Sequence, residues 1–152
     1  MSAVGAWLEP QEGASWACHV TWRRRARVRE GERVRYETTR GEAKEARWLH
    51  VKGGHLLSYR DAEGSYAVRL ERDRILMVRR GAVSLTQVFS AGKSQDLVLR
   101  AYGRELPVHA ETKSVEVSVG ESGGRARVLF DLAYADGVSQ SVDLVFQWVR
   151  PS

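Results

Sequence analysis

Apolar and polar residues alternate with a period of two along most of this chain. In the stretch 18–29, one row holds Cys18, Val20, Trp22, Ala26 and Val28, and the other row holds His19, Thr21, Arg23, Arg25, Arg27 and Arg29. Successive side chains of a β-strand point to opposite faces, so this pattern predicts a strand with one buried face. Arg24 is an exception, because its parity places it in the apolar row.

Turn residues separate the alternating runs. Residues 75–89 predict a hairpin, in which the apolar run 75–78 is followed by a turn at 79–81 and then by Val83, Leu85, Gln87 and Phe89 with period two. Gly53-Gly54 and Asp136-Gly137 are favoured hairpin turns between two further pairs of runs. After a turn at 30–32, we expect the inward row to continue through Val34, Tyr36 and Thr38.

The complete pattern predicts about eight to ten strands. The apolar parity changes between Leu106 and Val119, and a bulge or a sharp bend near Thr112 to Ser114 would explain the change. No segment has a sustained apolar spacing of 3.6 residues. Short sequential turns favour an all-β, antiparallel up-and-down barrel, since closure removes exposed strand edges.

Length and composition predict one domain over residues 16–152, preceded by a flexible N-terminal tail at 1–15. The only cysteine, Cys18, excludes an intrachain disulfide and a cysteine zinc cluster, and it is interpreted as a small core residue. The start lacks a signal-peptide pattern, and no run of about 18 apolar residues exists to span a bilayer. We therefore expect a cytoplasmic protein with no membrane partner.

Three stretches carry a resemblance to a known family. They are ILMVRRGAVSLTQVFSAG, YGRELPVHAETKSVEV and GRARVLFDLAY, with matching features at Arg79, Gly81, Phe89, Gly92, Gly103, Thr112 and the strand 124–134. This half of the chain resembles the YwiB-like family of bacterial proteins of unknown function, whose fold is a lipocalin-like (calycin) β-barrel. A tyrosine expected in that family is replaced here by Val98. The resemblance implies a closed barrel, a cytoplasmic location and no established catalytic residues.

Four polar side chains fall in apolar rows: Arg24, Arg79, Gln87 and Thr112. An unpaired guanidinium is costly to bury, so each arginine needs an acceptor, a ring, water or an acidic ligand. One hypothesis is a lumen in which Arg24, Arg79 and Gln87 orient a small anionic or amphipathic molecule among Trp22, Tyr36, Phe89, Phe130 and Phe146. The alternative is structural, with both arginines closing the barrel ends. Calycin barrels often pack a first-strand tryptophan against an arginine, and the resemblance makes Trp22 and Arg24 candidates for that pair.

The basic residues suggest a second function. Residues 1–80 hold 17 Lys and Arg against 11 Asp and Glu, and the expected basic face consists of Arg23, Arg25, Arg27, Arg29, Arg33 and Arg35. Such a face suits an interaction protein that binds an acidic protein or RNA. Because Trp22 and Tyr36 are expected on the opposite face, no stacking platform for bases is predicted. The alternative is a solvated charge ladder with neighbouring glutamates.

The sequence contains no recognisable catalytic or metal motif. His50 and His55 are expected as diagonal neighbours on one face, but a third metal ligand is missing nearby. Cys18 and His19 point to opposite faces, which argues against a nucleophile pair. Phosphate-binding glycine loops and a GxSxG elbow are also lacking. We therefore predict no catalytic residues, no cofactor and no metal site.

Overall fold

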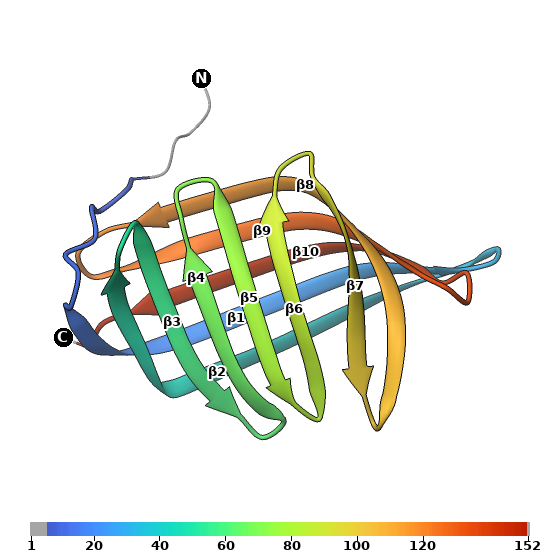
Figure 1. The fold of residues 1–152 in the computed structure, drawn as a ribbon, viewed down its shortest axis with the longest axis horizontal. Coiled ribbons are helices and arrows are strands. Elements are labelled where there is room, and N and C mark those ends of the chain that lie inside the picture. Colours follow the sequence, from blue (N-terminus) through green and yellow to red (C-terminus); the bar gives the residue numbers. More distant parts are fainter. Residues whose placement is uncertain (1–5, 152) are drawn as a thin grey trace.

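A computed structural model of the chain describes residues 6–151 and contains a closed antiparallel barrel of ten strands (Figure 1). The strands follow one another in chain order, and β1 pairs with β10 to close the ring. Their bounds are β1 Ser15–Glu30, β2 Arg33–Val51, β3 Gly54–Asp61, β4 Gly64–Leu70, β5 Arg74–Gly81, β6 Val83–Ser90, β7 Ser94–Ala101, β8 Arg104–Val119, β9 Gly123–Tyr134 and β10 Ser139–Val149. The predicted all-β, antiparallel up-and-down barrel is confirmed.

The barrel combines long and short strands. β1 and β2 have 16 and 19 residues, whereas each strand from β3 to β7 has 7 or 8. The β1–β2 and β9–β10 hairpins therefore extend past the body of the barrel, at the right of Figure 1. Side chains 31–40 are all exposed in this extension.

Inward side chains of all ten strands form the core. Cys18 is 1% exposed within it, and burial raises the pKa of its thiol to about 11. A thiol with so high a pKa is a poor nucleophile at neutral pH, because the thiolate is the reactive form. This environment agrees with the interpretation of Cys18 as a core residue.

The register of β1 and β2 corrects one expectation. The turn between these strands has two residues, so even positions of β1 oppose odd positions of β2: Val28 lies opposite Arg35, and Arg27 lies opposite Tyr36. Directly opposed residues share a face of the sheet. The prediction that Tyr36 belongs to the inward row was therefore wrong, and its side chain is 77% exposed.

Two bulges adjust the inward rows. The predicted bulge in β8 is confirmed by a register shift between Thr112 and Ser114 against β9. A second register shift separates Cys18 and Val20, which oppose Ala46 and Ala43 of β2. The segment 41–45 is thus part of the continuous strand β2, with one irregularity.

The segment 6–14 lies against one end of the barrel. Trp7 and Leu8 pack against the core, the backbone N–H of Leu8 donates to Val119, and that of Gly13 donates to His50. These contacts are more extensive than those of the loose tail expected over 1–15, of which residues 1–5 lie outside the described part of the chain. Within residues 6–151, no helix has the length and apolar character needed to cross a membrane.

Candidate functional site

The candidate site lies at the end of the barrel that carries the β3–β4, β5–β6 and β9–β10 turns, here called the arginine end. Arg24 enters it from β1, and Nη2 of its guanidinium donates to Oε1 of Gln140 on β10 at 2.7 Å. No carboxylate oxygen among the described residues lies within 4.0 Å of this guanidinium. Burial lowers the pKa of Arg24, while Tyr134 and Glu37 act in the opposite direction. Arginine nevertheless stays protonated in proteins, so Arg24 brings a positive charge without an adjacent negative one.

Arg79 reaches the arginine end from β5. Its Nη2 lies 2.9 Å from Oε2 of Glu63, and its guanidinium lies 5.2 Å from the ring centre of Tyr66. The Arg79 side chain is 26% exposed and that of Glu63 is 65% exposed, so this ion pair is partly solvated. Arg79 thus has both a carboxylate and an aromatic partner, whereas Arg24 forms neither an ion pair nor a cation–π contact with the described residues.

An aromatic column of three rings has Arg79 over the ring at one end and Arg24 two residues along β1 from the ring at the other end. The rings of Trp22 and Tyr59 stack at 5.3 Å between centres, and those of Tyr59 and Tyr66 stack at 4.9 Å with 6° between their planes. Gly41 makes room for the first ring, because a Cβ atom at that position would lie 2.2 Å from Cζ2 of Trp22. The aromatic column therefore forms a stack of three rings with the guanidinium of Arg79 at its Tyr66 end.

Both tyrosines of the column are neutral near pH 7. Burial raises the pKa of Tyr66 to about 12, and burial followed by the neighbouring Tyr66 raises the pKa of Tyr59 further. Tyr134 at the edge of the site has a pKa raised by the same cause. The charges at the site consequently come from its arginines and from the carboxylates of Glu63, Asp61 and Glu37.

Gln87 lies deeper in the barrel than Arg79. On the paired strands β5 and β6, Arg79 opposes Leu85, and the next inward pair is Met77 with Gln87. Gln87 is 3% exposed, and its Nε2 has no hydrogen-bond partner within residues 6–151. An unsatisfied buried donor of this kind costs about 1–3 kcal/mol. Its amide is therefore available to an acceptor inside the barrel.

The remaining lumen residues of the prediction lie at different depths. Phe89 is buried and its ring lies 4.9 Å from that of Phe130, below the layer of Gln87. Phe146 and Thr112 are also buried. Trp22, Arg24, Arg79 and Gln87 thus face the barrel interior as expected, whereas Tyr36 lies outside it.

Sequence reasoning missed four members of the site. Tyr59, Tyr66, Tyr134 and Gln140 all occupy inward positions near the arginine end. The alternating pattern would have indicated them if each inward row had been extended to the end of its strand. Tyr59 lies two positions after Leu57, and Gln140 lies two positions before Val142. The alternating rows identify inward residues, but they do not indicate which inward residues of different strands contact each other.

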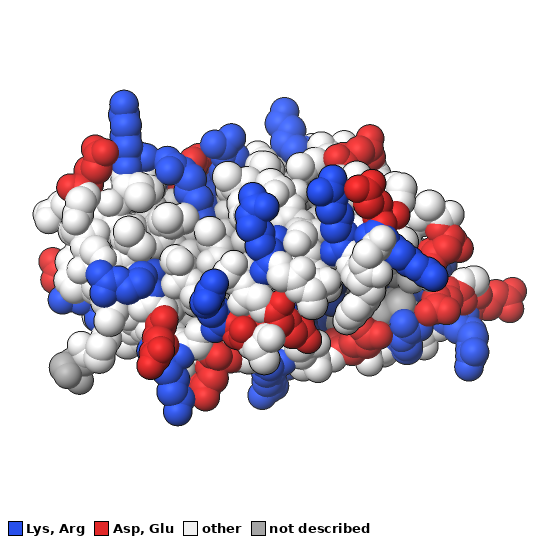
Figure 2. Space-filling model, turned by 60° about the horizontal axis from the view of Figure 1, so that its bottom comes forward, with Lys and Arg blue, Asp and Glu red and all other residues white. Residues whose placement is uncertain are grey.

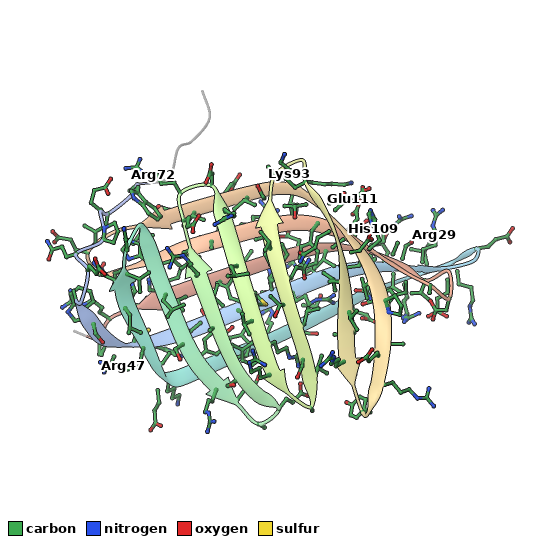
Figure 3. All side chains as sticks on the ribbon, in the orientation of Figure 1. Arg29, Arg47, Arg72, Lys93, His109 and Glu111 are labelled. Atoms are coloured by element: carbon green, nitrogen blue, oxygen red, sulfur yellow. The ribbon has the colours of Figure 1, made fainter. Side chains whose placement is uncertain are left out.

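The basic face also differs from the prediction. Arg23, Arg25, Arg27 and Arg29 do project from the outer face of β1, with Arg29 on the extended part of the hairpin (Figure 3). Arg33 and Arg35 do not join them, because they oppose Glu30 and Val28 on the other face, and Arg35 forms ion pairs with Glu30 and Glu37. Arg40 and Tyr36 take their place, opposite Arg23 and Arg27.

Positive and negative side chains are interspersed on the side of the molecule seen in Figure 2. Several outer arginines have carboxylate partners; Arg127, for example, forms two hydrogen bonds of 2.9 and 3.0 Å with Asp143. The side chain of Arg127 is the first cause of the lowered pKa of Asp143. The outer arginines therefore form separate local groups and not one uniform basic surface.

The two histidines lie at the opposite, covered end of the barrel. His50 and His55 oppose each other directly, rather than diagonally, and both are buried. Nδ1 of His55 accepts from Trp48 at 3.0 Å and its Nε2 donates to the carbonyl of Leu8 at 2.8 Å. Among the described residues, no group of three or more His, Cys, Asp or Glu is placed to hold a metal ion.

A tryptophan–arginine contact is also found at this covered end. The guanidinium of Arg150, just after β10, lies 4.5 Å from the ring centre of Trp16 on β1. Trp22 and Arg24 were the expected pair, but the ring of Trp22 stacks on Tyr59 instead. The first-strand tryptophan that meets an arginine is therefore Trp16.

This architecture defines the chain as a closed, ten-stranded antiparallel β-barrel protein. Its residues 29–145 match the family described as "Domain of unknown function (DUF1934)", and the chain belongs to that family. It is similar to the crystal structure of YwiB protein from Bacillus subtilis, with a TM-score of 0.68, 18% sequence identity, and coverage of 88% of this chain and 92% of that one. No curated protein matches the chain. The predicted YwiB-like resemblance is confirmed.

Proposed function

We propose that this protein binds a small amphipathic anion at the arginine end of its barrel. The observation that carries the proposal is the guanidinium of Arg24, which is half-buried and bonded to the neutral amide of Gln140 instead of a carboxylate. Desolvating a charge without a counter-charge is unfavourable. A carboxylate or phosphate group of a ligand supplies that counter-charge, with two parallel hydrogen bonds to the guanidinium fork.

The body of the ligand contacts the aromatic column. The stacked rings of Trp22, Tyr59 and Tyr66 include Trp22, which lies in the same inward row of β1 as Arg24, and a planar ligand ring adds to such a stack at little conformational cost. An aromatic acid therefore suits the site better than a branched aliphatic acid. The amide of Gln87, deeper in the barrel, selects for a polar atom at the far end of the ligand.

The alternative, a purely structural role for both arginines, fits Arg79 better than Arg24. Arg79 has Glu63 and the ring of Tyr66 as partners, as expected of a residue that closes the barrel end. Arg24 lacks such partners. We therefore assign ligand binding to Arg24 and a supporting, closing role to Arg79.

A thermal-shift screen tests the proposal with indole-3-acetate and dodecanoate as acidic probes, and with indole-3-acetamide and dodecanol as uncharged counterparts. Bound ligand raises the free energy of unfolding by about 2.7 kcal/mol at a hundredfold excess over Kd. We expect an acid to raise the melting temperature of the wild type but not of Arg24→Gln. The control Arg60→Gln removes the same charge from an exposed outer position of β3 and should respond like the wild type. Equal shifts in both variants would contradict the proposal.

A further inference from the structure

A separate polar groove lies on the outside of the barrel, across β1, β2, β9 and β10. Its volume is about 270 Å³, and its lining consists of Thr21, Trp22, Arg23, Arg40, Arg125, Val145 and Gln147. Three of these seven residues are arginines and none is acidic. Apart from Trp22, which also belongs to the aromatic column, the groove is separate from the arginine end, since Arg23 and Arg24 point to opposite faces of the same strand.

Strand register brings the three arginines together. Arg23 on β1 opposes Arg40 on β2 and, on its other side, Val145 on β10. One row along, Thr21 opposes Gln147, which in turn opposes Arg125 on β9. Like charges directly opposite each other destabilise a sheet, so the Arg23–Arg40 pair requires compensation.

That compensation is missing from the described protein residues. No carboxylate oxygen in residues 6–151 lies within 4.0 Å of the guanidinium groups of Arg23, Arg40 or Arg125. Nearby Asp143 already holds Arg127 through two hydrogen bonds. Glu42, the outward neighbour of Arg40, pairs with His19.

Arg23 is partly buried in the groove. Its Nε is buried and has no hydrogen-bond partner among the described residues. Val145 beside it faces outward by parity yet is only 6% exposed, as expected where long arginine stems cover an apolar residue. The unpartnered Nε is therefore a donor that an anion in the groove could satisfy.

We infer that this groove binds a phosphate group. Three guanidinium forks need an anion with several acceptor oxygens, and a phosphate provides three or more together with a charge of about −1.5 to −2 at pH 7. The hydroxyl of Thr21 and the amide of Gln147 add neutral donors to the same groove. A carboxylate has only two oxygens and one charge, so it leaves one of the three arginines without a partner.

The phosphate belongs either to a small molecule or to a nucleic-acid strand. Beside the phosphate groove lies a second groove of about 380 Å³, whose lining includes Arg25, Arg27 and Lys113 as well as Tyr36. Tyr36 is 77% exposed there, and an exposed ring next to phosphate-binding arginines can stack on a base. Asp131 and Asp143 also line this second groove, and their negative charges repel the phosphates of a nucleic-acid strand that runs through it.

Calorimetry with inorganic phosphate and pyrophosphate, combined with NMR of the arginine Nε–H signals, tests the phosphate groove. We expect pyrophosphate to shift the Nε–H signal of Arg23, and Arg23→Gln or Arg125→Gln to weaken binding at least tenfold. Arg125 is exposed, so its variant is a second test if Arg23→Gln unfolds. Arg60→Gln, with the same charge change on another face, should bind like the wild type. An unperturbed Arg23 signal, or an equal loss in Arg60→Gln, would overturn the assignment.

A short oligouridine distinguishes the two sources of phosphate in the same assays. A nucleic-acid ligand predicts tighter binding of oligouridine than of pyrophosphate, a steep decrease with salt, and a loss of oligouridine affinity alone in Tyr36→Ala. A small phosphorylated molecule predicts oligouridine no tighter than pyrophosphate, and no effect of Tyr36→Ala. Either result supports phosphate binding in this groove, and absence of binding by phosphate, pyrophosphate and oligouridine would reject it.

Discussion

Arg24 and Gln140 join β1 to β10 through a hydrogen bond of 2.7 Å, in which a guanidinium meets a neutral amide where a carboxylate is the usual partner. An isolated charge of this kind favours an external anion and does little for the stability of the ligand-free barrel. Functional sites commonly retain such groups at the expense of stability.

Arg24→Met tests whether Arg24 contributes to the stability of the ligand-free barrel. Methionine keeps much of the stem length and removes the desolvated charge, so we expect the free energy of unfolding without ligand to change by less than about 1 kcal/mol. Arg79→Met, in contrast, leaves Glu63 and the Tyr66 ring without their partner and should destabilise the barrel more. Urea unfolding of both variants makes the comparison. A larger loss of stability in Arg24→Met would indicate a structural role for Arg24.

Gly41→Ala probes the aromatic column. The added Cβ would lie 2.2 Å from Cζ2 of Trp22, so the indole must move off Tyr59, and we expect a loss of about 1–3 kcal/mol. Gly120→Ala is the matched control, because its Cβ would meet only one atom, at 3.8 Å. Urea unfolding followed by tryptophan fluorescence measures both. Equal stability of the two variants would show that Trp22 has room to adjust.

Trp7→Ala tests how firmly the N-terminal segment is attached. Trp7 packs against the core and its ring lies 5.2 Å from that of His55, so truncation should cost about 2 kcal/mol, less than a fully buried tryptophan. Glu12→Ala, at an exposed position of the same segment, should leave the free energy of unfolding within about 0.5 kcal/mol of wild type. If both variants are neutral, residues 6–14 contribute little, as expected of a loose tail.

The two buried histidines predict a decrease in stability at acidic pH. Burial is the first cause of the lowered pKa of both His50 and His55. Below the ordinary pKa of 6.5 the unfolded chain binds protons that the folded chain does not, so the free energy of unfolding falls as pH falls through that value. Above it, the contribution is fully present.

Urea unfolding between pH 7.5 and 5 measures this effect above the range in which carboxylates titrate. His55→Gln removes one of the two titrating rings, so it should reduce the slope of stability against pH. Glutamine retains an acceptor for Trp48 and a donor for Leu8, which limits other effects of the change. His109→Gln serves as the control: His109 is exposed, and hydrogen bonding to Asp96 raises its pKa, so its effect on the slope has the opposite sign. A steeper slope in His55→Gln would contradict this explanation.

Much of the fold follows from the alternating pattern. The strand count, the sequential antiparallel order and the bulge at Thr112 were predictable, because a one-residue change of parity would expose an entire buried row. The position of Tyr36 was not, because it depends on whether the β1–β2 turn has two residues or three. That single difference exchanged Tyr36 and Arg35 between the faces of the sheet.

The candidate site was predictable only in part. Parity identified Arg24, Arg79 and Gln87 as inward polar residues, but it does not indicate distances between residues on separate strands. The contact between Arg24 and Gln140 spans 116 residues, and the column of Trp22, Tyr59 and Tyr66 combines three strands. The phosphate groove likewise depends on the order β2, β1, β10, β9, which only barrel closure establishes.

The most direct test of ligand binding by Arg24 is a calorimetric cycle that compares indole-3-acetate with indole-3-acetamide, each titrated into wild type and Arg24→Gln. A contact between the acid and the guanidinium predicts that the wild type prefers the acid at least tenfold, equivalent to about 1.4 kcal/mol, and that Arg24→Gln abolishes this preference. Equal affinities for acid and amide in the wild type, or an acid preference that survives in Arg24→Gln, would contradict the account.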